Sequence, residues 1–288
     1  MSAGSQILLD KRLVQAARRL AEAGVEDAPR EARRLAQLAL RVGPGELFAR
    51  KIGLLTSAED AALNRLIVRR AARVPFARLA GEREFWSLSF RLVAATLEPR
   101  PETETLVEAA LARTDDRDAA LRVLDLGTGS GCLLLALLSE LPRAIGLGVD
   151  VDRGALDCAR ANAERLGYAE RATWRQADWA TGLEGPFDVV LANPPYVAEG
   201  DWETLEPEVR DHDPKQALVA GPSGLDAYLR IIPEIARLLA PEGFACLEIG
   251  AGQARAIGRE AAKAGLGVVE IRRDLAQIER CVVLATAR

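Results

Sequence analysis

An apolar run leads into three alternating glycines at residues 123–131, Val123-Leu124-Asp125-Leu126-Gly127-Thr128-Gly129-Ser130-Gly131. Together with the helical pattern that follows over 131–141, it is typical of a buried strand that turns sharply into a helix. Glycine has no Cβ, so the backbone can approach a ligand closely, and a helix start offers unpaired N–H groups to an anionic group. The stretch therefore predicts a loop that binds a nucleotide-like ligand, although a plain strand-to-helix turn could need the same glycines.

Further apolar runs of strand length follow, most of them separated by helical patterns. We expect seven strands, at residues 121–125, 145–150, 172–176, 187–192, 243–249, 267–271 and 281–285. This alternation predicts an α/β fold with a doubly wound, mostly parallel, Rossmann-like sheet that is covered by helices on both faces. Since the last two runs are only about ten residues apart, too few for a helical crossover, the final strand is expected to be antiparallel.

Residues 1–75 differ from the rest in both pattern and charge. Apolar residues recur there at helical spacing, and Ser57 followed by Asp60 predicts the capped start of a helix over 58–73. We therefore expect a small helical bundle over 1–75, a linker with a β-hairpin over 76–100, and the α/β domain over 101–288. The first 75 residues carry 14 Lys and Arg against 8 Asp and Glu, whereas the remainder carries 24 against 34. The basic domain could attract an acidic partner, but an exposed arginine-rich helix face has the same composition.

Composition excludes several classes of protein. The 288 residues are 49% hydrophobic and 28% charged, which is typical of a globular chain. Since there is no opening signal-like segment and no 18-residue uncharged apolar run, we expect a cytoplasmic protein without a membrane partner. The four cysteines form no C-x-x-C pair, and the single histidine, His212, leaves no Cys/His cluster for zinc, so no metal is expected.

The ends of the next two strands indicate which ligand the glycine loop takes. Asp150 ends the strand 145–150, about twenty residues after the loop, where a carboxylate can accept both ribose hydroxyl hydrogens. Asp178 and Trp179 follow the third strand. The Asp178 carboxylate could accept a hydrogen bond from an exocyclic amine, and the Trp179 indole could lie against a purine. Dinucleotides and S-adenosylmethionine both fit such a loop. Two features favour S-adenosylmethionine. The spacing here is G-x-G-x-G in place of the dinucleotide fingerprint G-x-G-x-x-G, and Asp125 carries a carboxylate that is unfavourable beside a pyrophosphate.

The strand 187–192 runs directly into the turn Asn193-Pro194-Pro195-Tyr196. Two prolines fix φ and remove two N–H donors, which leaves a rigid turn with outward carbonyls between an amide and a phenol. The Asn193 side-chain oxygen and the Pro194 carbonyl could accept both protons of an NH₂ group and hold its nitrogen in line with a methyl sulfonium. Tyr196 would cover the flat face of the substrate. We therefore expect methyl transfer to a planar nitrogen, without an obligatory general base.

These motifs together resemble the class I S-adenosylmethionine-dependent methyltransferases that modify planar nitrogens, which include DNA adenine and protein glutamine methyltransferases. Five segments are similar to those of the peptide-chain release factor glutamine N5-methyltransferases. They are 75–81, 84–86, 99–104, Gly224-Leu225-Asp226 and Leu247-Glu248-Ile249-Gly250. The resemblance covers nearly the whole chain. It implies methylation of the side-chain amide of a release-factor glutamine, with S-adenosyl-L-homocysteine as the second product.

The resemblance also implies roles for individual residues. The cofactor would be bound by Gly127, Thr128, Gly129, Ser130, Gly131, Asp150, Asp178, Trp179 and Asn193. Asn193, Pro194 and Tyr196 would be catalytic, and the target glutamine would be bound by Asn193, Pro194, Pro195 and Tyr196. The basic N-terminal domain would dock a class 1 release factor, and nucleic acid is not expected as a substrate. The chain departs from the family pattern at Arg78, Glu98 and His212, positions that bear on substrate docking rather than on the chemistry.

Three other functions stay open at this point. A glutamine methyltransferase acting on a ribosomal protein would need the same turn and would differ only in its docking surface. A nucleic-acid adenine-N6 methyltransferase would need a basic groove and a long target-reading insertion after the turn, but the α/β part is acidic. A cofactor-binding module without catalysis would have no use for the Asn-Pro-Pro-Tyr turn.

Overall fold

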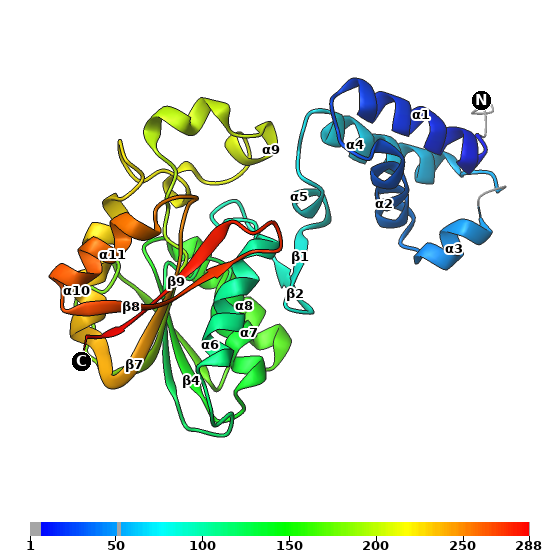
Figure 1. Ribbon diagram of the computed structural model, residues 1–288. Helices are drawn as coiled ribbons and strands as arrows, with labels where there is room; N and C mark the ends of the chain where they lie inside the picture. Colours follow the sequence, from blue (N-terminus) through cyan, green and yellow to red (C-terminus); the bar gives the residue numbers. More distant parts are fainter. Residues whose placement is uncertain (1–6, 51–52, 288) are drawn as a thin grey trace. The chain divides into compact units, whose positions relative to one another are not determined.

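Two groups of elements make up the structure, a computed structural model that describes residues 7–50 and 53–287 (Figure 1). Contacts along the chain divide it into a helical unit, 1–81, and a sheet unit, 82–288. The segment 76–81 therefore goes with the helices, and the residues that follow it go with the sheet. Within the described ranges, no helix is both long and apolar enough to cross a membrane.

The first unit is a helical bundle, as the sequence predicts. Its helices are α1 (Leu9–Glu22), α2 (Ala28–Leu40), α3 (Pro44–Ala49), α4 (Ser57–Ala71) and α5 (Phe76–Ala80). Leu20, Leu35 and Leu63 come from three of these helices and are fully buried in one apolar core. Because their neighbours at helical spacing are also buried, α1, α2 and α4 each turn one apolar stripe toward this core.

The start of α4 corrects one prediction. Thr56, not Ser57, precedes the helix: its hydroxyl accepts a hydrogen bond from the Glu59 N–H at 3.2 Å, and the Glu59 carboxylate accepts from the Thr56 N–H at 2.8 Å. This reciprocal pair is a capping box, shifted by one residue from the predicted Ser57–Asp60 pair. The sequence has two adjacent hydroxyl residues that could begin the capping box, Thr56 and Ser57. The side chain of Glu59 is longer than that of Asp60 and reaches back to the Thr56 N–H, so the box forms at Thr56.

The second unit is built on a seven-stranded sheet, which confirms the predicted fold class. Its strands are β3 (Arg122–Leu126), β4 (Ile145–Asp150), β5 (Ala172–Gln176), β6 (Phe187–Ala192), β7 (Leu239–Glu248), β8 (Leu266–Arg273) and β9 (Glu279–Thr286). Their order is β5-β4-β3-β6-β7-β9-β8. The pairs from β5 to β7 are parallel, whereas β9 is antiparallel to both β7 and β8, as expected for the short connection before it.

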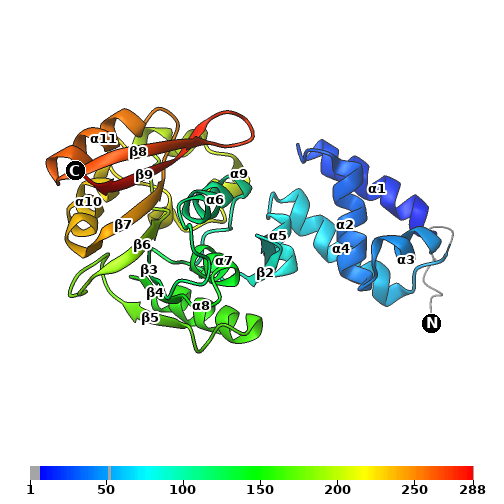
Figure 2. The same cartoon turned by 60° about the horizontal axis from the view of Figure 1, so that its bottom comes forward.

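Helices cover both faces of this sheet (Figure 2). One face carries α6 (Glu104–Ala112), α7 (Cys132–Glu140) and α8 (Arg153–Leu166), and the other carries α10 (Asp226–Leu238) and α11 (Ala254–Lys263). Val123 and Leu124 are adjacent in β3 and belong to the two different cores. Successive side chains of a strand point to opposite faces, so a strand that is buried on both sides needs the continuous apolar run seen in the sequence.

The expected hairpin is present as β1 (Glu82–Phe85) and β2 (Leu88–Arg91). Trp86 and Ser87 form its turn with φ of 51° and 58°, a left-handed conformation that non-glycine residues seldom adopt. The Trp86 backbone N–H donates to Glu104 at 2.8 Å and its indole N–H donates to Glu140 at 2.8 Å. These two bonds, to α6 and to the end of α7, hold the strained turn against the sheet unit.

Candidate active site

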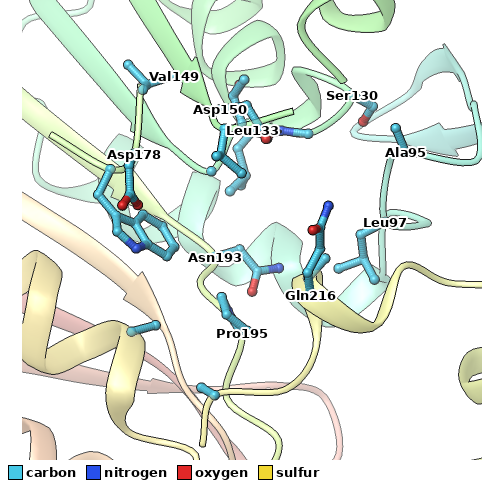
Figure 3. Close-up of a pocket in the computed structure, with 18 of the residues that line it drawn as sticks. Ala95, Leu97, Ser130, Leu133, Val149, Asp150, Asp178, Asn193, Pro195 and Gln216 are labelled. Atoms are coloured by element: carbon cyan, nitrogen blue, oxygen red, sulfur yellow. Dashed lines mark hydrogen bonds between the residues drawn. The ribbon is translucent and has the colours of Figure 1, made fainter. Parts of the chain in front are cut away.

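The predicted site segments all lie at one edge of the sheet, because β3, β4, β5 and β6 are parallel and end on the same side. The chain winds outward from β3 to β5 and then returns to place β6 beside β3, which opens a crevice between the loops after β3 and β6. A cavity of about 410 Å³ occupies this position, a size that suits a small-molecule ligand (Figure 3).

Most of the residues predicted for the site line this cavity. They are Gly127, Thr128, Gly129, Ser130, Asp150, Asp178, Trp179, Asn193 and Pro195. Gly131, Pro194 and Tyr196 are not part of the lining. Pro194 is buried, and half-buried Tyr196 directs its hydroxyl at Glu248. Their predicted roles in binding the substrate stay predictions.

The glycines of the loop are required by the backbone. Gly127, Gly129 and Gly131 have φ of 74°, 55° and 80°, which favours glycine at each position. A Cβ on Gly127 would lie 3.3 Å from the Trp179 ring, whereas one on Gly131 would lie 3.0 Å from the Trp174 ring. Gly127 therefore gives space to an aromatic wall of the cavity, and Gly131 allows α7 to start close against the sheet.

Asp125 lies beneath the loop. It is 1% exposed, and the Thr128 hydroxyl donates to its Oδ2 at 2.5 Å. Burial raises the pKa of this carboxyl to about 7, although the bond from Thr128 opposes the shift. The sequence suggests a carboxylate that faces the ligand, but Asp125 is outside the cavity lining and supports the loop from below.

Asp150 both braces the loop and lines the cavity. Its Oδ2 accepts a hydrogen bond from the Gly129 N–H at 2.9 Å, and its Oδ1 accepts from the Asp152 N–H at 2.9 Å. Each carboxylate oxygen has a second lone pair, so both can also accept a ribose hydroxyl hydrogen. Desolvation is the largest influence on this carboxyl and raises its pKa.

Replacing Asp150 by asparagine is expected to weaken binding of S-adenosylmethionine by roughly 1–3 kcal/mol, because one oxygen becomes an NH₂ donor that faces a backbone N–H or a ribose hydroxyl. Isothermal titration of the ligand measures the change. Asp152→Asn is the matched control, since an asparagine there can still accept the bond from the Ala155 N–H that begins α8. Equal dissociation constants for Asp150→Asn and the wild type would refute the ribose role.

The loop after β5 supplies one wall of the cavity. Trp179 has a φ of 53°, and its ring approaches Gly127. Asp178 is half exposed and accepts a hydrogen bond from the Arg230 guanidinium at 2.5 Å. Arg230 also lines the cavity and comes from α10, one helical turn after Asp226. Arg230 cannot be predicted as a site residue from the sequence, since nothing in the pattern of α10 connects it to the end of β5.

Asn193 is held by a residue from a distant segment. Its Nδ2 donates to the Thr103 hydroxyl oxygen at 3.4 Å, which leaves Oδ1 to accept a different hydrogen bond. Thr103 is buried at the end of η1 (Pro101–Thr103) and lines the cavity. In the sequence, Thr103 stands out only as part of the segment 99–104 that is similar to a family motif, and the hydrogen bond gives that segment a physical role.

Two further segments contribute residues to the lining of the cavity. Ala95 and Leu97 come from the stretch before η1, and Gln216 comes from η3 (Lys215–Ala217), as Figure 3 shows. These residues are not among the site residues predicted from the sequence. They lie in irregular stretches, where neither the spacing of apolar residues nor a turn motif indicates which side chains meet.

The departures from the family pattern at Glu98 and His212 lie close to this lining. Buried Glu98 is paired with the Arg83 guanidinium at 3.5 Å, so its charge is compensated. Its backbone N–H donates to Asp213, the neighbour of His212, at 3.3 Å, and Arg100 reaches the same carboxylate at 2.5 Å. These bonds tie the segment before η1 to the loop that follows the Asn-Pro-Pro-Tyr turn.

The residues of the cavity fit S-adenosylmethionine. The glycine loop leaves open the space that Cβ atoms would fill, and backbone N–H groups at the start of α7 suit a carboxylate. The Asp150 carboxylate can accept hydrogen bonds from the two hydroxyls of a ribose, and the Trp179 ring offers a flat surface to a purine. With the doubly wound seven-stranded sheet, this donor set defines a class I S-adenosylmethionine-dependent methyltransferase.

Comparison with known proteins specifies the family. The methyltransferase small domain model matches residues 103–207, and the PrmC N-terminal domain model matches residues 12–81. The release factor glutamine methyltransferase of Rhodospirillum rubrum is 45% identical over 279 residues, which cover 97% of this chain and 85% of that protein. The protein of the same name from Bradyrhizobium diazoefficiens is 45% identical over 269 residues, 92% of this chain and 91% of that one. The chain belongs to the release factor glutamine methyltransferase family, which confirms the resemblance seen in its motifs.

A solved structure gives the same fold. The methyltransferase from Pyrococcus furiosus has a TM-score of 0.51 at 17% identity, and the match covers 75% of this chain and 97% of that one. At this identity the likeness concerns the fold alone.

Proposed function

We propose that this chain transfers the methyl group of S-adenosylmethionine to the side-chain amide nitrogen of a glutamine in a class 1 peptide-chain release factor. The products are N5-methylglutamine and S-adenosylhomocysteine. The observation that carries the proposal is the Asn193 side chain, whose Nδ2 is bonded to Thr103 and whose Oδ1 is left to a ligand at the cavity. Membership of the family supports the choice of substrate.

The cofactor is held by the loops at the carboxyl ends of β3, β4 and β5. The glycine loop and the start of α7 take the methionine end, Asp150 takes the ribose, and Asp178 and Trp179 take the adenine. When bound, S-adenosylmethionine supplies a methyl group on a positively charged sulfur. The proposal involves no metal.

The residues of the turn orient the substrate. An amide nitrogen is a poor nucleophile because its lone pair is delocalised into the carbonyl group. The Asn193 Oδ1 and the Pro194 carbonyl accept its two N–H groups, which holds the nitrogen for in-line attack and favours the positive charge that develops on it. The methylated nitrogen is strongly acidic at that stage and loses a proton to water, so no residue has to remove the proton first.

Docking of the release factor is assigned to the N-terminal unit. A groove of about 950 Å³ there is lined by apolar residues of α1 and α3, by three arginines of α2 together with Pro29 and Gln37, and by one acidic residue, Asp10 of α1. Val14 is 66% exposed and Phe48 is 79% exposed, so two large apolar side chains face water. Arg30 and Arg33 lie on the rim and are also exposed. Apolar anchors with a basic rim suit an acidic, amphipathic segment of a protein.

Reversing the charge of the groove is expected to raise the KM for intact release factor. In the double variant Arg30→Glu/Arg33→Glu, like charges would meet across the interface, and the KM should rise by at least about tenfold with kcat unchanged. Steady-state kinetics with the intact factor measures this. The control variant Arg19→Glu/Arg65→Glu makes the same charge change at exposed positions outside the groove lining. An equal rise in both variants would point to net charge instead of the groove.

The proposed function is tested by incubating the purified chain with methyl-labelled S-adenosylmethionine and, separately, a class 1 release factor, ribosomal proteins and adenine-containing DNA. Peptide mass analysis then locates the label. We expect one labelled release-factor glutamine. Label confined to a ribosomal-protein glutamine or to adenine would keep the chemistry of the turn and overturn the substrate.

A further inference from the structure

A glutamine side chain lies behind the Asn-Pro-Pro-Tyr turn and takes no part in the steps above. Gln253 immediately precedes α11 and lies outside the cavity lining. Its Nε2 donates to the Tyr196 carbonyl oxygen at 3.0 Å and to the Gly224 carbonyl oxygen at 3.3 Å, and its Oε1 accepts from the Gly250 N–H at 2.9 Å. One side-chain amide therefore joins three separate segments of backbone.

These bonds fix which end of the Gln253 amide faces the turn. The NH₂ group has two hydrogens to donate, whereas the amide oxygen can only accept. Both hydrogens are used by carbonyl oxygens, so the reversed orientation would place an oxygen against two oxygens and an NH₂ group against the Gly250 N–H. Two glycines leave the space for this arrangement: a Cβ on Gly250 would lie 3.0 Å from the Gln253 Oε1, and one on Gly224 would collide with the Tyr196 carbonyl oxygen.

Tyr196 anchors the far end of the Asn-Pro-Pro-Tyr turn. The two prolines have no N–H to donate, so the turn depends on hydrogen bonds at its ends. At the near end, Asn193 directly follows β6. At the far end, the Tyr196 N–H donates to the Leu218 carbonyl oxygen at 3.1 Å, and the Tyr196 carbonyl oxygen accepts from Gln253. Loss of the Gln253 donor would therefore loosen the end of the turn that β6 does not hold.

Gly224 connects the same glutamine to another wall of the cavity. Asp226 begins α10 two residues after Gly224, and Asp226, Ala227 and Arg230 line the cavity. The helix α10 packs beside α11, which Gln253 precedes (Figure 2). Gln253 is thus bonded on one side to the turn that would hold the substrate amide, and on the other to the segment that leads into the α10 wall.

We propose that Gln253 is a positioning residue that acts through the Tyr196 carbonyl to align the substrate amide nitrogen with the methyl group of S-adenosylmethionine. In-line transfer depends steeply on this alignment, whereas the affinity for either substrate alone does not. The side chain itself lies behind the turn and outside the cavity lining. This inference rests on the proposed function, since it assigns Gln253 a part in methyl transfer to a glutamine.

Two substitutions test the role of the donor. Gln253→Glu keeps the shape of the side chain and an oxygen for the Gly250 N–H, but at pH 8 it turns a carboxylate oxygen toward two carbonyl oxygens. Gln253→Met removes donor and acceptor without adding a charge. Both should lower kcat at saturating substrates by roughly 10- to 100-fold, with the KM for release factor and the dissociation constant of S-adenosylmethionine within about threefold of wild type.

A matched control and a folding measurement accompany these variants. Gln277→Glu makes the same chemical change at an exposed position between β8 and β9 and should behave as the wild type. The thermal unfolding midpoint shows that each variant is folded. A folded Gln253→Glu or Gln253→Met enzyme with the kcat of the control would overturn the inference. A rise in the KM or in the dissociation constant as large as the fall in kcat would also overturn it, because the change would then lie in binding and not in alignment.

A spectroscopic measurement tests the hydrogen bond without turnover. Tyr196-Val197 is the single Tyr-Val pair in the sequence. Labelling tyrosine carbonyls with ¹³C and valine amides with ¹⁵N therefore gives one carbonyl-to-amide NMR signal, which reports this peptide bond. The carbonyl shift should move in Gln253→Glu and Gln253→Met and stay in place in Gln277→Glu. An unmoved shift would overturn the inference whatever the substrate, whereas a shift that moves in an enzyme whose wild type methylates no glutamine would overturn the proposed function.

Discussion

Replacement of Asn193 by alanine is expected to lower kcat for methyl transfer by roughly 10³-fold, because the substrate amide loses the acceptor that orients its nitrogen. The backbone of the turn should persist, since the prolines fix it and β6 is buried on both faces. Single-turnover kinetics with saturating S-adenosylmethionine measures the loss at the chemical step. A thermal unfolding midpoint close to that of the wild type would show that the fold has survived.

Gln176→Ala is the matched control for this experiment. Gln176 ends β5 at the same edge of the sheet and also carries an amide, which donates to the Val151 carbonyl at 2.9 Å, but it lies outside the cavity lining. Its removal should leave kcat within about twofold of wild type, in line with the small effect of most exposed substitutions. A kcat for Asn193→Ala within tenfold of the control would exclude the proposed mechanism, because methyl transfer would then not depend on the Asn193 side chain.

The second large effect is expected on stability, from replacing Asp125 by asparagine. Burial raises the pKa of Asp125 from 3.8 to about 7, so between these values the folded chain holds a proton that the unfolded chain releases. Raising the pH through this window therefore destabilises the wild type, by about 4 kcal/mol in total. An asparagine at this position cannot ionise, and its amide oxygen can still accept the bond from Thr128.

Urea unfolding between pH 4 and pH 8 measures this effect. The stability of Asp125→Asn relative to the wild type should increase as the pH rises through the window and level off above pH 7. Glu248 has a raised pKa as well and contributes to the slope in both proteins, so only the difference between them reports Asp125. Asp115→Asn, at an exposed position of the loop after α6, should show no such trend. A difference independent of pH would mean that Asp125 is ionised in the fold at acid pH.

Much of the fold can be predicted from the sequence because its strands are short apolar runs with clear ends. The predicted ranges 145–150, 172–176 and 187–192 agree with β4, β5 and β6. In contrast, β7 begins at Leu239, ahead of the predicted 243, because Leu239 pairs with Phe187 of β6; the residues 240–243 that follow lie at an irregularity, and regular pairing resumes at Phe244. Such pairing depends on a neighbour that is distant in sequence, and no local pattern reveals it.

The residues of the candidate site also fall into those that the sequence predicts and those that it does not. The glycine loop, Asp150 and Asn193 each follow a strand directly, so their position in the sequence also fixes their place at the edge of the sheet. Arg230, Gln216 and Thr103 reach the cavity from a helix or from irregular segments. Their side chains become site residues only after the packing of α10, η3 and η1 has been fixed.

The sequence by itself determined the α/β class, the antiparallel last strand and the rigid Asn-Pro-Pro-Tyr turn, because each follows from local spacing and from the backbone limits of glycine and proline. Only the tertiary structure decided that Asp125 supports the loop from below and that Thr103 holds Asn193. Hydrogen bonds and desolvation depend on which groups are brought together in space. Asn193 and Thr103 are 90 residues apart, and only the folded sheet places them within hydrogen-bonding distance.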